Sequence, residues 1–257
     1  MNREGLWVAF CTILDKEVGR FMRIWAQTIV PPAVSMALYF MIFGHLIGPR
    51  IGRMDGYTYM QFIAPGLIMM SIINNAYANV VSSFFGAKFQ KHLEEMLVAP
   101  IPNWIILAGY IGGGVARGLA VGLVVTGVAL LFTRLHIHHF LVVIVVVLLT
   151  SVLFSLAGLI NAIYARKFDD ISIIPTFVLT PLIYLGGVFY SINLLPEFWQ
   201  AVSRINPVLY MVNAFRYGLL GTSDVNVGAA LLVITGFVIA LTAYALYLLE
   251  KGIGIKT

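Results

Sequence analysis

Six apolar runs, each about as long as a bilayer is thick, constrain this chain more than any other feature of its sequence. The runs lie at 24–46, 59–85, 104–132, 140–164, 171–190 and 229–249. About 20 apolar residues are enough for a helix to cross a ~30 Å hydrocarbon core. Because 60% of the residues are hydrophobic and only 11% are charged, the chain lies far outside the soluble globular class. We predict an all-α integral membrane protein with six transmembrane helices, built as one domain over 1–257.

The segment before the first run, residues 3–21, has the periodicity of an amphipathic helix. Its apolar residues recur at three- and four-residue spacing, and they are Leu6, Phe10, Ile13, Leu14, Val18 and Phe21. Such a helix favours the membrane interface over a transmembrane position. We predict an N-terminal interfacial helix, and the alternative is a solvated lead-in to the first span.

The segment between the fifth and sixth runs, 191–228, is too long for a turn and still apolar. Two helix starts are marked, at Leu195-Pro196 and at Asn206-Pro207, where asparagine is a good N-cap and proline suits the first helical position. Each piece is too short to cross a bilayer. We predict a re-entrant helical hairpin that enters from the outer face.

The distribution of lysine and arginine indicates the orientation of the chain. With the N-terminus inside, ten basic residues are cytoplasmic: Arg3, Lys16, Arg20, Arg23, Lys88, Lys91, Arg166, Lys167, Lys251 and Lys256. Five are on the outer side: Arg50, Arg53, Arg134, Arg204 and Arg216. Because cytoplasmic loops carry the excess of basic residues, we expect both termini in the cytoplasm. The same residues meet anionic lipid heads, so the basic balance favours membrane lipids over nucleic acid as partners.

Motifs for catalysis are missing from the sequence. It contains no G-x-x-x-x-G-K-[ST] phosphate loop, no H-E-x-x-H and no G-x-S-x-G. The single cysteine, Cys11, excludes an intramolecular disulfide, and we expect no metal site, although His136, His138 and His139 form an outer cluster that could bind one. The predicted spans contain no acidic residue, which weakens the case for an ion-coupled carrier. We expect the driving reaction to lie in a separate partner.

Four polar residues inside the predicted spans are candidates for a transport path: Asn75, Asn79, Arg117 and Asn161. A charge at this depth is costly, so Arg117 should face the bundle or a wet cavity and contact an anionic substrate or lipid head. The alternative is that its side chain extends to the cytoplasmic face. The asparagines could equally hydrogen-bond between helices, and Gly114, Gly118 and Gly122 predict close helix packing within the subunit or across a dimer.

The inner loop that follows the second span is longer than a connector needs to be. Over 86–100 it predicts a helix of about three turns with Phe89, Leu93, Met96 and Leu97 on one side, ended by Pro100 and Pro102. Glu94 and Glu95 add exposed charges. The loop is therefore built to contact another molecule.

These segments together resemble the ABC-2-type permeases. The inner-loop segment that ends Glu94-Glu95-Met96-Leu97-Val98-Ala99-Pro100 resembles their coupling helix. The stretch that runs from Asp169-Asp170 through PLIYLGGVFY (181–190), Leu195-Pro196 and Asn206-Pro207 to Arg216 is similar to their C-terminal signature. With the six-span plan, the resemblance covers nearly the whole chain. The carbohydrate exporters of the family have an aromatic-lined channel, and no such set is matched here.

The resemblance implies the ABC-2, or type V exporter, fold and an assembly of two copies of this chain with two copies of a separate ABC ATPase. ATP and Mg²⁺ would be bound by that ATPase, so this chain would hold no cofactor and would not be an enzyme by itself. The cargo would be amphiphilic, lipid-linked or drug-like, exported across a bacterial inner membrane. The residues implied in coupling to the ATPase are Lys88, Phe89, Lys91, Leu93, Glu94, Glu95, Met96, Arg166, Lys167, Asp169 and Asp170.

Two other classes remain as alternatives. A stand-alone secondary carrier or channel would need internal repeats and ion sites at the bilayer midplane, and neither is evident. An intramembrane lipid-modifying enzyme would need a constellation of carboxylate and histidine residues, which is also missing.

Overall fold

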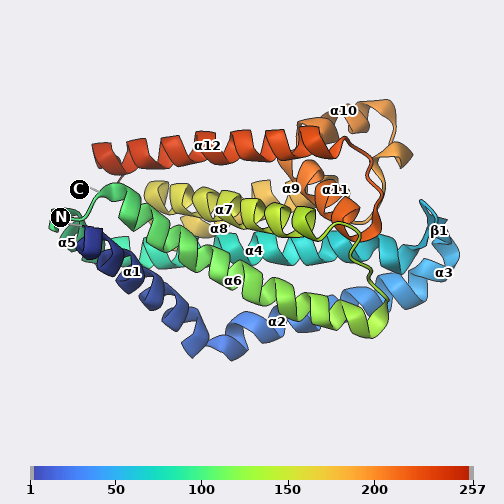
Figure 1. Cartoon of the computed structure of the whole chain (residues 1–257), viewed down its shortest axis with the longest axis horizontal. Coiled ribbons are helices and arrows are strands. Elements are labelled where there is room, and N and C mark those ends of the chain that lie inside the picture. Colours follow the sequence, from blue (N-terminus) through green and yellow to red (C-terminus); the bar gives the residue numbers. More distant parts are fainter. Residues whose placement is uncertain (1–2, 255–257) are drawn as a thin grey trace.

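Helices form most of the described chain, residues 3–254 of the computed structural model, in agreement with the predicted all-α class (Figure 1). The long helices are α1 (Arg3–Arg23), α2 (Trp25–Tyr39), α4 (Tyr59–Phe89), α6 (Asn103–Phe132), α7 (Phe140–Tyr164) and α12 (Val227–Lys251). The shorter ones are η1 (Phe40–Ile47), α3 (Gly48–Ile51), α5 (His92–Val98), α8 (Asp170–Ile174), η2 (Pro175–Leu179), α9 (Thr180–Leu185), η3 (Ile192–Leu194), α10 (Glu197–Ile205) and α11 (Pro207–Leu220). Two short antiparallel strands, β1 (Arg53–Met54) and β2 (Tyr57–Thr58), add a small hairpin that the sequence did not predict.

Five of the six predicted spans are helices long and apolar enough to cross a membrane. They are Trp25–Ile51, Tyr59–Phe89, Asn103–Phe132, Phe140–Tyr164 and Val227–Lys251. The sixth, predicted at 171–190, is the shorter apolar run Asp170–Leu185, made of α8, η2 and α9. Its segments of 5, 5 and 6 residues reach about 24 Å at 1.5 Å per residue, less than a ~30 Å core. It ends early because Gly186-Gly187 follow, and Gly187 adopts a φ of +72°.

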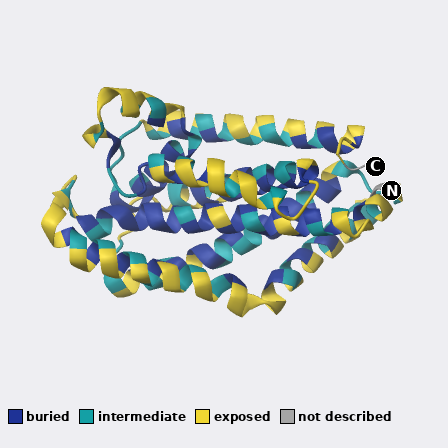
Figure 2. Ribbon diagram, turned by 180° about the vertical axis from the view of Figure 1, so that it is seen from behind, coloured by how far each residue is buried: buried dark blue, intermediate teal, exposed yellow. Residues whose placement is uncertain are grey.

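Helix α4 lies at the centre of the bundle, and α6 and α7 pack along it (Figures 1 and 2). The three glycines of α6 at four-residue spacing, Gly114, Gly118 and Gly122, face neighbours within the chain: a Cβ at Gly118 would lie 3.2 Å from both Ala76 of α4 and Ser151 of α7. Gly114 meets Ser155 of α7 in the same way. The small residues at four-residue spacing therefore serve packing inside the subunit, which was one of the two roles the sequence left open.

Helices α2 and α12 lie on opposite sides of this centre and expose large apolar side chains, as the yellow segments of Figure 2 show. Leu38 of α2 and Leu232 of α12 are among them, 50% and 76% exposed. Leucine side chains exposed along whole helices are unfavourable in water but not in a bilayer. The helical form also satisfies every backbone group internally, as a bilayer requires. The exterior therefore matches a lipid environment.

The two ends of the bundle carry different elements. One end, here called the inner end, contains the N-terminus of α1, the C-terminus of α12 and the whole of α5 (Figure 1). The other, here called the outer end, contains β1, α3, α10 and α11. Residues 1–2 and 255–257 of the predicted domain, including Lys256, lie outside the described residues.

The predicted amphipathic helix 3–21 forms as α1, which continues to Arg23. Its residues Ile13, Glu17 and Phe21 are buried, and the helix runs obliquely along the inner half of α6. Two of these three were assigned to the apolar face, whereas Glu17 has a polar partner on α4. The amphipathic pattern thus predicted the helix and its packed face.

The predicted helix starts of the outer segment are also present, because α10 begins after Pro196 and α11 begins at Pro207. Asn206 caps α11 by accepting a hydrogen bond from the N–H of Val208 at 2.9 Å. Its Nδ2 donates to the carbonyl of Leu182 at 2.6 Å. The same residue therefore starts α11 and fastens it to α9.

Substitution of Gly158 tests the close packing of α7 on α4. A Cβ there would lie 2.6 Å from the backbone oxygen of Tyr77, so Gly158→Ala should destabilise the bundle by about 1–3 kcal/mol through overpacking. A lower midpoint of thermal unfolding in detergent would measure this. Gly127→Ala is the control, because a Cβ at Gly127 of α6 meets nothing within 4 Å. Equal midpoints for the two variants would contradict the packing.

Candidate docking surface and polar clusters

The predicted helix 86–100 is divided in two at the inner end. Its first residues continue α4 to Phe89, and α5 then begins at His92 after a sharp turn in which Lys91 adopts a left-handed φ of +62°. The sequence gives little sign of this break, because the left-handed region favours glycine or asparagine rather than lysine. The separate helix α5 is therefore only 7 residues long.

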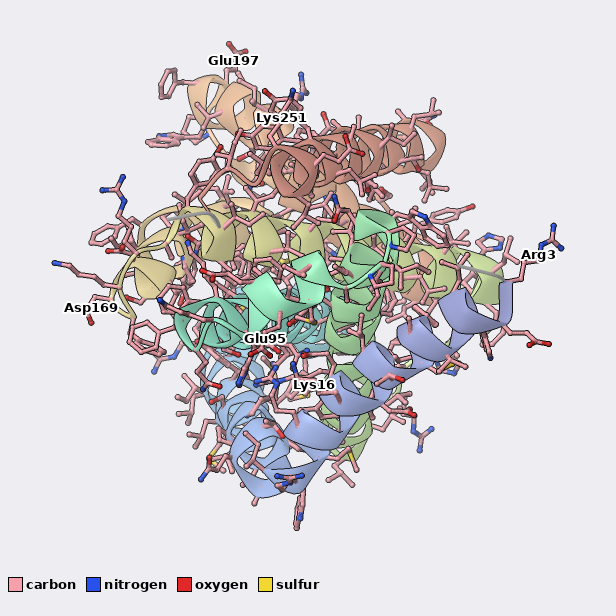
Figure 3. All side chains as sticks on the ribbon, turned by 90° about the vertical axis from the view of Figure 1, so that its left-hand side faces the viewer. Arg3, Lys16, Glu95, Asp169, Glu197 and Lys251 are labelled. Atoms are coloured by element: carbon pink, nitrogen blue, oxygen red, sulfur yellow. The ribbon has the colours of Figure 1, made fainter. Side chains whose placement is uncertain are left out.

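The side chains of α5 divide between the bundle and solvent. Leu93 is fully buried and packs in the core, while Glu94 and Glu95 are exposed and Met96 is half-buried. Figure 3 looks onto this end, where Glu95 lies near the centre, Asp169 on one side and Arg3 on the other. The family resemblance included Leu93 among the coupling residues, but its buried side chain instead anchors α5 to the core of the bundle.

Lys88 joins α4 to the loop that follows α7. Its Nζ donates hydrogen bonds to the carbonyls of Ile163 and Ala165, at 2.6 and 2.7 Å. These carbonyls lie at the C-terminal end of α7, where backbone oxygens lack helical partners and a cation is favoured. Lys88 therefore holds the two inner loops together, and its ammonium is used inside the chain.

Three phenylalanines form an aromatic cluster beside α5. Ring centroids of Phe85 and Phe89 are 6.1 Å apart, and Phe168 lies 5.0 Å from each of them. Phe85 is buried, whereas Phe89 and Phe168 are 61% and 56% exposed. Sequence reasoning missed Phe168, although both inner loops contain the same Lys-Phe pair, Lys88-Phe89 and Lys167-Phe168. The repeated pair was the available signal.

The loop 166–170 places charged groups next to this cluster. The carboxylate of Asp170 accepts hydrogen bonds from the backbone N–H groups of Arg166 and Lys167, at 2.8 and 3.0 Å. These bonds lower the pKa of Asp170 below its ordinary value, and the bond from the N–H of Arg166 has the larger effect. The side chains of Arg166, Lys167 and Asp169 remain exposed. With Phe89, Phe168, Lys91, Glu94, Glu95 and Met96 they form what we call the docking surface.

A buried polar cluster ties α1 to the half of α4 that lies nearer the inner end. Glu17 is fully buried and accepts a hydrogen bond from the hydroxyl of Ser83. Arg20 lies 3.5 Å from Glu17 and donates to the backbone and side-chain oxygens of Asn79, at 2.8 and 2.9 Å. A buried carboxylate is tolerated when it is paired and hydrogen-bonded in this way. Glu17 and Arg20 are functional candidates that the amphipathic pattern of α1 did not reveal.

Arg117 extends the polar cluster by one helical turn along α4. Its Nη2 donates to Oδ1 of Asn75 at 3.2 Å, so Asn75, Asn79 and Arg117 lie together between α4 and α6. Asn161 lies apart from them, because its Nδ2 donates to the hydroxyl of Tyr77 and the carbonyl of Ile171. Three of the four predicted pathway residues therefore gather, and Asn161 instead bridges α7, α4 and α8.

A second buried cluster closes the outer end. Arg216 is 1% exposed, donates to the carbonyl of Gly187 at 2.6 Å and lies 3.8 Å from the carboxylate of Asp224. Its guanidinium also lies 4.0 Å from the ring centroid of Phe62 on α4. The sequence places Arg216 among the charges that flank the spans on the outer side. In the structure its side chain is buried and joins α11, the 186–188 turn and α4.

Two of the predicted outer histidines attach the loop before α7 to α11. His138 and His139 each donate a backbone N–H to the carbonyl of Gly218, at 2.9 and 2.8 Å, and the ring of His139 stacks on Tyr217. Within residues 3–254, no three metal-ligating side chains gather at one point.

Comparison with known proteins identifies the class of protein. The sequence profile of the ABC-2 type transporter family matches residues 8–220, so this chain belongs to that family. The inner membrane transport permease YadH of Escherichia coli K12 is 58% identical to it over 251 residues, 98% of each chain. Nodulation protein J of Rhizobium meliloti is 24% identical over 238 residues, which are 87% of this chain and 90% of that protein. The chain is a multi-pass transport permease of the inner membrane.

Replacement of Lys88 tests the link between the inner loops. Lys88→Met removes two hydrogen bonds from a charged donor, each contributing about 1.5–3 kcal/mol. Amide hydrogen exchange over 163–170 should become faster, because the end of α7 loses its partner. Lys91→Met is the matched control, since Lys91 is exposed three residues away. The link is refuted when both variants exchange alike.

Replacement of Arg216 tests the outer cluster. Arg216→Met leaves Asp224 buried without its counter-charge, which should cost about 3–5 kcal/mol. We expect a marked fall in the thermal midpoint of the purified permease. Arg204→Met removes an exposed arginine from the neighbouring helix α10 and should change the midpoint little. Equal effects would mean that the buried pair does not stabilise the outer end.

Proposed function

We propose that this chain is the membrane-spanning subunit of an ABC exporter, which works as two copies bound to two copies of a separate ATPase. The observation that carries the proposal is the docking surface at the inner end of the buried central helix α4. ATP and Mg²⁺ would be held by the ATPase, which supplies hydrolysis. The family and the relative named as an inner membrane transport permease support this assignment.

The docking surface has the composition of a protein interface. It combines two exposed aromatic rings, Phe89 and Phe168, with charges of both signs around them. Aromatic anchors surrounded by a polar rim carry most of the binding energy in such interfaces. A surface of this kind at the inner end favours a cytoplasmic protein partner over lipid.

The mechanical link runs through α4. It is 31 residues long, its N-terminus is fixed by a capping box between Thr58 and Gln61, and most of its length is buried. A displacement of α5 and Phe89 by the ATPase would therefore move a rigid element that reaches the outer end. Because Glu17 and Arg20 fasten α1 to α4, the N-terminal helix would move with it. Only contacts that differ between two states of the ATPase can drive this change.

The cargo is proposed to be amphiphilic, lipid-linked or drug-like and to leave toward the outer side. The cluster of Asn75, Asn79 and Arg117 supports a polar contact for it, because Arg117 Nε and Asn79 Nδ2 have no hydrogen-bond partner in the described chain. Donors of this kind suit an anionic or hydroxyl-rich head group. The apolar remainder of the bundle suits the hydrophobic part of such a molecule.

In the proposed orientation, both termini, α5 and loop 166–170 are cytoplasmic, in agreement with the excess of basic residues in these segments. The short run Asp170–Leu185 serves as the fifth of six crossings, and α10 with α11 forms the re-entrant hairpin on the outer side. The amphipathic helix α1 lies at the inner interface. Irregular backbone such as the 186–196 segment is compatible with membrane depth where protein shields it.

Substitutions on the docking surface test the proposed ATPase contact. Glu94→Ala with Glu95→Ala should weaken ATPase association or uncouple transport. Phe89→Ala with Phe168→Ala removes both anchors, and a loss of about 2 kcal/mol corresponds to roughly 30-fold weaker binding. The measurements are co-purification with an ABC ATPase from a neighbouring reading frame that encodes G-x-x-x-x-G-K-[ST], and ATPase activity that depends on this subunit.

Glu250→Ala provides the control, because Glu250 is an exposed carboxylate at the inner end of α12, outside the docking surface. It should leave co-purification and ATPase activity unchanged. Unaltered association and transport in the Glu94/Glu95 and Phe89/Phe168 variants would remove the proposal. Transport by the purified permease without any ATPase would favour the stand-alone carrier instead.

A further inference from the structure

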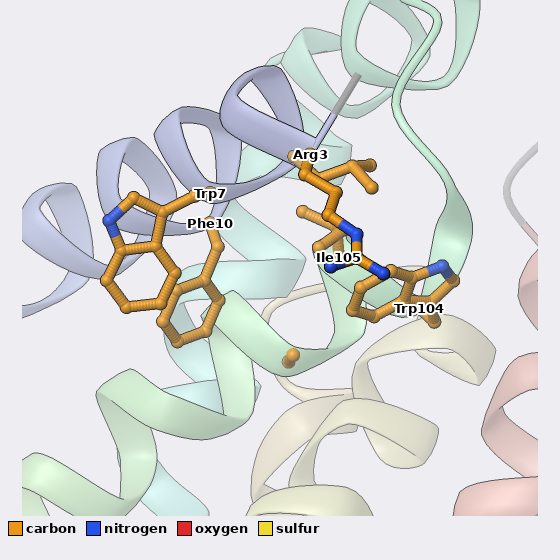
Figure 4. A pocket seen from close by; sticks show the side chains of 7 residues that line it. Arg3, Trp7, Phe10, Trp104 and Ile105 are labelled. Carbon is orange, nitrogen blue, oxygen red and sulfur yellow. The ribbon is translucent and has the colours of Figure 1, made fainter. Parts of the chain in front are cut away.

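A groove of about 390 Å³ lies between the first turns of α1 and the start of α6 (Figure 4). Arg3, Leu6, Trp7 and Phe10 line it from α1, and Trp104, Ile105 and Ala108 line it from α6. Figure 4 shows the Arg3 side chain reaching from α1 toward Trp104, with Trp7 and Phe10 farther along α1. The groove is separate from the docking surface and from the polar cluster around Arg117.

The groove exists because the two helices diverge toward the N-terminus of α1. Farther along, glycines of α6 let them touch: a Cβ at Gly109 would lie 2.7 Å from the Cβ of Ile13, and Gly113 lies against Glu17. One turn earlier, α6 carries larger side chains, Trp104 and Ile105, which hold α1 away. The buried bonds of Glu17 and Arg20 fix the close end. The fold therefore builds a wedge-shaped opening with a fixed apex.

The chemistry of the groove fits an amphiphile with a negative head. Six of its seven lining residues are apolar or aromatic, and the remaining one is Arg3. Arg3 is exposed and forms no ion pair with any residue between 3 and 254. Trp7 and Trp104 are 66% and 52% exposed on the two walls. Tryptophan favours the boundary between head groups and hydrocarbon, and arginine there attracts anionic lipid.

We propose that this groove binds an acidic phospholipid of the cytoplasmic leaflet. One acyl chain lies in the groove against Leu6, Phe10 and Ile105, and the phosphate pairs with the guanidinium of Arg3. Charge complementarity selects this occupant over a neutral lipid, since the only charge among the described lining residues is positive. The inference rests on the proposed cytoplasmic orientation of the inner end, but not on the ATPase.

The test uses the purified permease alone in vesicles, so it does not depend on finding the ATPase. Trp25→Phe and Trp199→Phe leave Trp7 and Trp104 as the only tryptophans of the chain. Their fluorescence is quenched by brominated acyl chains, carried either on phosphatidylglycerol or on phosphatidylethanolamine at equal mole fraction. We expect stronger quenching by the acidic lipid, and Arg3→Gln should reduce that preference about fivefold, the factor for one basic residue at the surface.

Two further variants separate a built site from general attraction. Arg23→Gln removes an exposed arginine from the other end of α1 and should leave the preference intact. Ala108→Phe fills the groove while Arg3 remains, and it should abolish the preference with the thermal midpoint retained. Equal quenching by the two lipids, or equal effects of Arg3→Gln and Arg23→Gln, would overturn the proposal. Loss of the preference on addition of inorganic phosphate at constant ionic strength would assign the site to a free anion and also overturn it.

Discussion

Glycine at the crossing points of α4, α6 and α7 is the constraint on which the rest of the structure depends. Lipid tails are as apolar as leucine, so helices in a bilayer gain little from hydrophobic burial and associate by close van der Waals contact. Gly118 and Gly158 permit that contact by letting α6 and α7 reach α4 without an intervening side chain. This packing on both sides holds the central helix in place along its length, and the central helix in turn positions the elements at its two ends.

Charged residues fasten those end elements, and they do so away from the middle of the bundle. At the inner end, Glu17 and Arg20 attach α1, and Lys88 attaches the loop after α7. At the outer end, Arg216 attaches α11 through Asp224 and the ring of Phe62. Each charge is hydrogen-bonded or paired, which is the condition for tolerating it in a low-dielectric interior. The bundle is thus held by packing at its centre and by polar bonds at its ends.

Helix α1 connects the two proposed sites of the inner end. Its middle is bonded to α4 one to two turns before Phe89, and its first turns form one wall of the lipid groove. A lipid in the groove and an ATPase on the docking surface would therefore both act on the position of α1. Such a connection would need no contact between the two ligands, because α1 packs closely on α6 near Gly109 and would move as one helix.

Local patterns in the sequence determined the helical class, five apolar helices of spanning length, the amphipathic helix α1 and the helix starts at Pro196 and Pro207. Each of these follows from hydrophobic length, periodicity or capping, which act over one or a few turns of chain. Only the tertiary structure decided that Phe168 joins Phe89, that Lys88 and Asn161 bond within the bundle, and that Arg216 is buried. These contacts join residues that are far apart in the sequence or lie on different elements. A single sequence carries no periodic signal for which distant side chains will meet, because packing between helices determines it.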